Sequence, residues 1–246
     1  QVAVAEPDGY TLVLAFDGTM VINPHVFDKV PFDTVKDFAP VGKIGNAILI
    51  LVANPNLPAK TLQEVVALSK KQTGGLSYGT SGVGGTPHIA GELLNQQSGA
   101  KLLHVPYKGG GPAMTDLLGG NITAIFASTP TAVPLIQGGK LRPIAVTSPK
   151  RTSGLPNVPT VAEQGYPGYQ ALNWYAFVAS SKVPAPIMDR WNTELVKVLK
   201  SPDVVDQLNS HGLTPQPGTR DELAKYIAKE SATWGRVIRE RKITGV

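Results

Sequence analysis

The sequence has no cysteine, few aromatic residues and little charge. Of its 246 residues, 7% are Phe, Trp or Tyr and 17% are charged, whereas 42% are hydrophobic. Without cysteine the chain forms no disulfide and has no thiolate chemistry. No apolar run approaches the roughly 20 residues that a membrane-spanning helix needs. The composition therefore excludes disulfide scaffolds, disordered chains, coiled coils and helical membrane proteins, and it predicts one or two globular domains.

The positive charge of the chain is small and dispersed. It has 23 Lys and Arg against 18 Asp and Glu, a formal net charge of +5. Basic residues gather only at Lys70–Lys71, at Lys150–Arg151 and in the segment 236–242. A nucleic-acid-binding surface has a denser basic stripe with interleaved aromatic side chains. We therefore predict a mildly basic surface and no nucleic-acid partner.

Short apolar, β-branched runs alternate with helical patterns, which is typical of βαβ units. Capping boxes at Thr61–Glu64 and Thr219–Glu222 mark two helix starts, and Ser201–Pro202 and Ala185–Pro186 mark two more. The expected strands lie at 10–16, 47–53, 76–79, 102–105, 122–126, 143–147 and 174–179.

The alternation of strands and helices ends near Trp174, and the remaining chain is mainly helical. A single sheet does not normally finish in this way. The sequence therefore predicts two lobes with two crossings between them. The first lobe is expected to contain residues 1–52 and 175–246, and the second residues 53–174.

Two glycine-rich segments join an expected strand to an expected helix, at Tyr78–His88 and at Val105–Ala113. Glycines let the backbone approach a guest closely, and the positive end of the following helix favours an anion. Together the two segments predict a site for a carboxylate that uses neither Arg nor Lys. The alternative is that both turns are simply tight and that Thr86 only caps its helix.

Two further loops follow strands, at Phe16–Met20 and at Phe126–Thr131. The first offers a hydroxyl and backbone groups to a ligand, or is a plain turn in which Asp17 bonds its own backbone. The second offers the uncharged donors Ser128 and Thr129, or only a helix cap.

Residue patterns that carry catalysis or bind cofactors are missing. The histidines His25, His88, His104 and His211 do not have metal-ligand spacing. Ser81 lacks the closing glycine of a nucleophile elbow, and Pro87 stands where a dinucleotide fingerprint needs its third glycine. We therefore predict no catalytic residue, no metal and no cofactor, and a binding protein over an enzyme.

These segments are arranged as in a known family. The sequence strongly resembles the Bug-type extracytoplasmic solute-binding proteins of tripartite tricarboxylate transporters, over essentially its whole length. The matching segments are Pro7–Leu12, Gly18–Thr19, Ile22–Pro24, Tyr78–Leu93, Val105–Gly109, Thr115–Gly120, Gly139–Arg142 and Pro159–Glu163.

The resemblance implies an α/β fold of the two-lobed, type II (Venus flytrap) periplasmic binding kind, with each lobe a sheet flanked by helices. It implies a ligand between the lobes, a mono-, di- or aromatic carboxylate, held by amides, hydroxyls and waters. It also implies a periplasmic location, a signal peptide in the precursor, delivery to membrane components of the transporter, and a monomer. The contacts that it implies are Gly18, Thr19, Ser81, Gly82, Thr86, Gly110, Gly111, Ser128, Thr129 and Asn173.

The sequence departs from the family pattern at three places. Many relatives carry Asp at the place of Ala127, so a ligand with an amino group is not expected here. Gly85 stands where relatives often have Ser, which removes a hydroxyl. The chain begins at a segment like the family's second strand, so we expect a preceding strand, glycine loop and helix to be missing.

A second function stays open on the residues alone. Helix N-termini bind phosphate as well as carboxylate, so an α/β enzyme or sensor domain for a nucleotide or phosphorylated metabolite is the alternative.

Overall fold

The computed structural model describes residues 1–152 and 154–245. The chain forms two compact units. Unit 1 contains residues 1–47 and the chain from 173 onward, and unit 2 contains residues 48–172. The lobes expected from the sequence divide at 52 and 174 instead.

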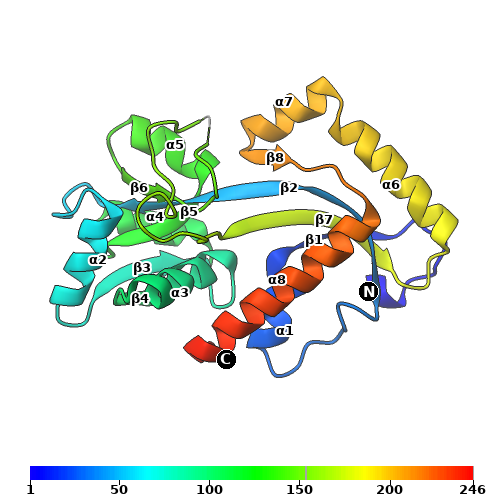
Figure 1. The fold of residues 1–246 in the computed structure, drawn as a ribbon, viewed down its shortest axis with the longest axis horizontal. Helices are drawn as coiled ribbons and strands as arrows, with labels where there is room; N and C mark the ends of the chain where they lie inside the picture. Colours follow the sequence, from blue (N-terminus) through cyan, green and yellow to red (C-terminus); the bar gives the residue numbers. More distant parts are fainter. Residues whose placement is uncertain (153, 246) are drawn as a thin grey trace. The chain divides into compact units, whose positions relative to one another are not determined.

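Unit 2 is a five-stranded sheet covered by helices, in the order β6-β2-β5-β3-β4 (Figure 1). β3 is parallel to β4 and to β5, whereas the end of β2 is antiparallel to β5 and β6. The elements are α2 Leu62–Lys71, β3 Leu76–Thr80, α3 Thr86–Ser98, β4 Leu102–Pro106, α4 Gly110–Leu118, β5 Ala124–Ser128, α5 Thr129–Gln137 and β6 Arg142–Val146, together with the end of β2 Phe38–Ala53.

Unit 1 places β7 between β1 and β2, with β8 paired to β2. In Figure 1 the long helix α8, red at its end, runs beside α1, and the two helices are in contact. The elements are a 3₁₀ turn Val2–Val4, β1 Leu12–Phe16, a π-helical turn Gly18–Ile22, α1 Asn23–Val26, β7 Leu172–Ser180, α6 Ala185–Leu199, α7 Pro202–Ser210, β8 Leu213–Pro215 and α8 Arg220–Arg241.

All seven expected strands are present, but β2 is much longer than predicted. It begins at Phe38, although the sequence favoured a strand only from Ala47. Pro40, Gly42 and Gly45 weaken the strand signal in this segment. Gly45 is needed there because a Cβ on it would lie 2.4 Å from the carbonyl oxygen of Thr214 in β8. The close approach of β8 therefore explains why Gly45, which weakens the sequence signal for β2, stands at this position.

The capping boxes are confirmed, and helices α6 and α7 begin at the predicted starts Ala185–Pro186 and Ser201–Pro202. Thr61 and Thr219 each accept a hydrogen bond from the backbone of the glutamate three residues later, and that glutamate bonds back. Ser201 is the N-cap residue of α7, but its hydroxyl donates backward to the carbonyl of Val198 at 2.6 Å.

Among the described residues, no helix combines the length and apolarity needed to cross a membrane.

Gly91 lets α3 pack directly on β3, which gives a test of the unit 2 core. A Cβ at Gly91 would lie 2.3 Å from the fully buried ring of Tyr78. We expect Gly91→Ala to lower the free energy of unfolding by about 1–3 kcal/mol through overpacking. Urea unfolding followed by circular dichroism measures this. The control is Gly154→Ala, where a Cβ meets no atom within 4 Å; equal stability of both variants would contradict the packing argument.

Candidate functional site

Three strand ends of unit 2 lie at one edge of its sheet. Because β3 is parallel to both β4 and β5, the carboxyl ends of these strands point the same way. Each strand then runs into a helix, β3 into α3, β4 into α4 and β5 into α5. Open α/β sheets bind ligands outside the carboxyl ends of their strands. The topology therefore brings together the predicted residues Ser81, Gly82, Thr86, Gly110, Gly111, Ser128 and Thr129.

The loop between β3 and α3 depends on glycine. Gly82 has φ +136° and Gly84 has φ +75°, conformations that other residues rarely adopt. The hydroxyl of Thr80 donates to the carbonyl of Gly82 at 2.9 Å. The alternative reading, in which Thr86 only caps its helix, is wrong, because the extended residue before the helix is Gly85 and Thr86 is the first helical residue. Glycine is a competent N-cap, so the threonine was not needed for that role.

The junction between β4 and α4 leaves its backbone open. A Cβ on Gly110 or Gly111 would meet no atom within 4 Å, so there is room for a small guest against this backbone. The Tyr107 amide donates to the carbonyl of Thr80 at 3.0 Å, which ties this junction to its neighbour. The Tyr107 hydroxyl donates to Asp116 Oδ2 at 2.7 Å and fixes the start of the junction to α4.

The junction between β5 and α5 has two hydroxyls at its start. Ser128 is the N-cap residue by position, but its hydroxyl does not bond the helix backbone. It lies 2.9 Å from the hydroxyl of Thr131, which donates to the Ser128 carbonyl at 2.9 Å. Thr129 is buried as the first helical residue. The alternative reading, in which the Ser128 side chain caps the helix, is therefore wrong.

The other predicted residues belong to unit 1. The segment after β1 is not the plain turn given as one reading but a π-helical turn that continues into α1. A Cβ on Gly18 would lie 2.6 Å from the outer edge of the exposed Phe16 ring, so a larger residue here would require that ring to move. Thr19 is partly exposed on the same turn. Asn173 Nδ2 donates to the Tyr175 hydroxyl at 3.1 Å. Ligand contacts by Gly18, Thr19 and Asn173 stay predictions.

Residues 1–243 match the family model described as tripartite tricarboxylate transporter family receptor. The chain belongs to this receptor family. It is 34% identical over 239 residues to protein BugT of Bordetella pertussis, an alignment that covers 97% of this chain and 73% of BugT. The Bug-type resemblance seen in the sequence is confirmed.

Solved structures of similar receptors show the same fold. The structure of Rpa4515 from R. palustris with adipate has a TM-score of 0.89 and 30% identity, covering all of this chain and 82% of that one. MatC from Rhodopseudomonas palustris with bound malate has a TM-score of 0.83 and 29% identity, covering 96% and 82%. The predicted two-lobed α/β binding-protein fold is therefore confirmed for this receptor.

A buried charge cluster in unit 1 of the receptor was missed by sequence reasoning. The ammonium of Lys43 lies 3.6 Å from the centre of the Tyr226 ring. Burial lowers the pKa of Lys43 to about 8, although the Glu230 carboxylate acts in the opposite direction. Burial raises the pKa of Tyr226, and the negative charges of Glu230 and Asp17 raise it further. The cluster therefore links α8 to Asp17, the residue just before the Gly18–Ile22 turn. These residues are far apart in the sequence, so no local pattern could reveal them.

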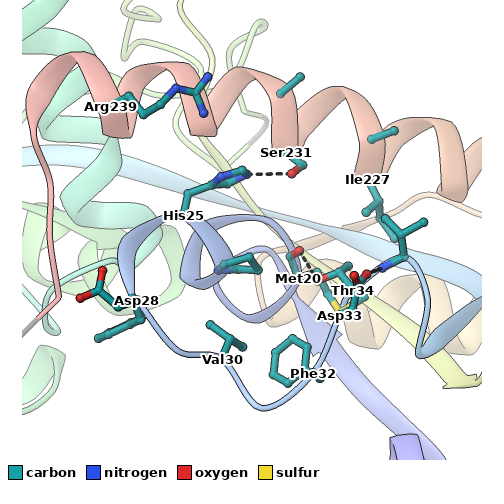
Figure 2. A pocket seen from close by; sticks show the side chains of 15 residues that line it. Met20, His25, Asp28, Val30, Phe32, Asp33, Thr34, Ile227, Ser231 and Arg239 are labelled. Atoms are coloured by element: carbon teal, nitrogen blue, oxygen red, sulfur yellow. Dashed lines mark hydrogen bonds between the residues drawn. The ribbon is translucent and has the colours of Figure 1, made fainter.

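Unit 1 also contains a pocket of about 620 Å³ between α1, the segment after it and α8 (Figure 2). In Figure 2 the ring of His25 points to Ser231, and the two side chains are 2.9 Å apart between Nε2 and Oγ. Burial lowers the pKa of His25, and the positive charge of Arg239 lowers it further. The lining carries both signs of charge, with Asp28 and Asp33 opposing Arg239. Its chemistry does not select a carboxylate, and no predicted site residue lines it.

The Tyr107–Asp116 pair gives a test of the β4–α4 junction. The hydrogen bond to Asp116 raises the pKa of the Tyr107 phenol to about 12, because the bond stabilises the protonated form. In Asp116→Ala we expect this pKa to fall toward 10, which carbon NMR of the tyrosine Cζ measures. Asp203→Ala, on exposed α7, is the control. An unchanged Tyr107 titration would show that the bond does not form in solution.

Proposed function

We propose that this receptor captures a small organic carboxylate at the strand ends of unit 2 and presents it, outside the cytoplasm, to membrane components of a tripartite transporter. The observation that carries the proposal is the convergence of three strand-to-helix junctions at one sheet edge. Two similar receptors whose structures contain adipate and malate support a carboxylate as the ligand.

The chemistry of the junctions suits a carboxylate better than a neutral solute. A carboxylate accepts several hydrogen bonds, and bonds to an ionised acceptor contribute about 1.5–3 kcal/mol each. Backbone amides at helix N-termini supply such donors, and each helix dipole adds about 0.3–1 kcal/mol. The hydroxyls of Ser81 and Thr86 add donors without adding charge. The anion is therefore recognised by dipoles and not by an ion pair.

The ligand is released unchanged in this proposal. The family is a receptor family, and the junctions carry hydroxyls and glycines but no acid–base pair. Among the described residues there is also no group of three side chains that would hold a metal ion. We further propose that the receptor acts as a monomer with no cofactor.

Isothermal titration with a matched panel tests the ligand class. We expect heat of binding with adipate, malate or benzoate, and none with adipamide, which has the length of adipate but no charge. Binding of a nucleotide such as AMP without binding of any acid would overturn the proposal and support the phosphate alternative.

The panel also tests the amino group. Ala127, at the end of β5, is buried among apolar side chains and offers no carboxylate to an ammonium group. We therefore expect malate to bind at least about tenfold more tightly than aspartate, since an unpaired ammonium costs more than 1 kcal/mol of desolvation. Equal affinity for the two would contradict this specificity.

Thr86→Val tests the threonine of the β3–α3 loop. Removing one hydroxyl donor to an ionised ligand is expected to weaken binding of the tightest acid by about tenfold, corresponding to 1.4 kcal/mol. Titration calorimetry measures the Kd, and thermal unfolding of the ligand-free protein is measured beside it. The control is Thr193→Val, whose hydroxyl bonds the carbonyl of Asp189 on exposed α6. A lower melting temperature with an unchanged Kd would assign the Thr86 hydroxyl to the fold alone.

A further inference from the structure

We propose that His88 and His104 form a stacked pair that fixes the conformation of the Gly82–Gly85 loop, and through it the contacts of that loop with a ligand. The inference deepens the proposed function, and its ligand-binding part rests on that function. Both histidines act as positioning residues, because each reaches the loop backbone directly or through Thr80.

The two rings join two separate elements of unit 2. His88 lies in the first turn of α3 and His104 in the middle of β4. Their ring centres are 3.7 Å apart and their planes differ by 12°, so the rings stack face to face. The ring of Tyr78, on the neighbouring strand β3, is 5.4 Å from that of His104. The stack therefore joins the start of α3 to the sheet immediately below the loop.

One side of the stack holds Gly84. The backbone N–H of Gly84 donates to Nδ1 of His88 at 3.2 Å. An imidazole nitrogen accepts only when it carries no proton, so His88 must be neutral with its proton on Nε2. This assigns the tautomer from the hydrogen-bond geometry.

The other side of the stack holds Gly82 through Thr80. The Thr80 hydroxyl has one proton, which it donates to the carbonyl of Gly82 at 2.9 Å. Nε2 of His104 is 2.6 Å from the same hydroxyl and must therefore be the donor. The N–H of Gly82 also donates to this oxygen, at 3.3 Å. Both backbone groups of Gly82 are thus fixed by one threonine, which His104 orients.

The surroundings keep the pair neutral. Burial lowers the pKa of His88 to about 4, and burial together with the neighbouring His88 lowers that of His104 to about 4. The titratable groups that face the pair within the described chain are Tyr78 on β3 and Glu92 on α3. The Glu92 carboxylate raises the pKa of His104 but does not offset burial. At neutral pH both rings are therefore in the form that the hydrogen bonds require.

The geometry favours positioning over metal binding. A metal would need the lone pair of His88 Nδ1, which the Gly84 amide uses, and the nitrogen of His104 that donates to Thr80. Face-to-face rings also do not converge their nitrogens on one point.

The first test measures the histidine tautomers and the Gly84 amide exchange in the ligand-free protein. Nitrogen NMR at pH 7.5 is expected to show both rings with the proton on Nε2. The Gly84 amide should exchange with solvent at least tenfold faster in His88→Leu than in the wild type, and near the wild-type rate in His88→Asn, whose amide oxygen replaces the acceptor. His211→Leu, at the exposed end of α7, is the control. A proton on Nδ1 of His88, or unchanged Gly84 exchange in His88→Leu, would overturn the proposal.

The second test reads ligand binding. We expect the Kd for adipate at pH 7.5 to rise about tenfold in His88→Leu and to stay within threefold of wild type in His88→Asn and His211→Leu. Equal weakening in the Leu and Asn variants would refute the positioning role. If the wild type binds no carboxylate, the proposed function fails, while the tautomer and the Gly84 exchange still decide whether the pair holds the loop.

The third test uses pH. Because the histidine pKa values are lowered from 6.5 in the folded protein, the unfolded chain takes up protons first on acidification. The melting temperature should fall as the pH drops from about 6.5 to about 4, and less steeply in His88→Asn. The Gly84 amide signal should shift with a midpoint near pH 4 in the wild type only. The same Gly84 titration in His88→Asn would contradict the assignment.

If His88→Leu fails to fold, the wild-type tautomer and the His88→Asn variant decide whether the pair positions the loop.

Discussion

The parallel pairing of β3 with β4 and β5 is the constraint on which the unit 2 site depends. Thr80 pairs with Pro106, and Gly79 with Ile125, so the strands end at the same edge. A parallel pair cannot be joined by a hairpin and needs a crossover, here a helix. Every strand end must then turn into a helix at that edge. The convergence of helix N-termini is therefore a consequence of strand direction and not of any single side chain.

Close packing keeps these junctions in place. A Cβ at Gly79 would lie 2.5 Å from the Ile122 side chain, and one at Gly91 would lie against Tyr78. At Gly91 the helix α3 thus approaches the sheet where only glycine fits, and at Gly79 the strand packs closely against the segment that leads into β5. Gly110 and Gly111, in contrast, have open space where a Cβ would be. Glycine consequently serves two purposes in one unit, close packing behind the strands and access to the backbone at their ends.

How much the sequence could predict follows from how local each signal is. The capping boxes at Thr61 and Thr219, the strands and the glycine junctions depend on neighbouring residues, and they were predicted. The first half of β2 was not predicted, because Gly45 is required by the close approach of β8, a strand that is distant in the sequence. The stack of His88 on His104 was missed for the same reason, since its effect on Gly84 exists only after β4 and α3 have packed. The sequence also left open that Thr86 caps α3, because its position next to the helix start allows it, but Gly85 is the N-cap residue in the structure.

The two units bury basic side chains in different charge states, and the difference separates their responses to pH. In unit 2 the buried ring of His88 and the half-buried ring of His104 are neutral, whereas in unit 1 the cation of Lys43 is buried against Tyr226 near Glu230. Burial lowers the pKa of each of these bases. As the pH falls from the unfolded pKa of the base to its folded pKa, the free energy of unfolding of the protein therefore falls. For the histidines that interval runs from 6.5 to about 4, and for Lys43 from 10.5 to about 8. Between about 6.5 and 8 neither interval applies, so these groups leave the stability of both units independent of pH across the neutral range.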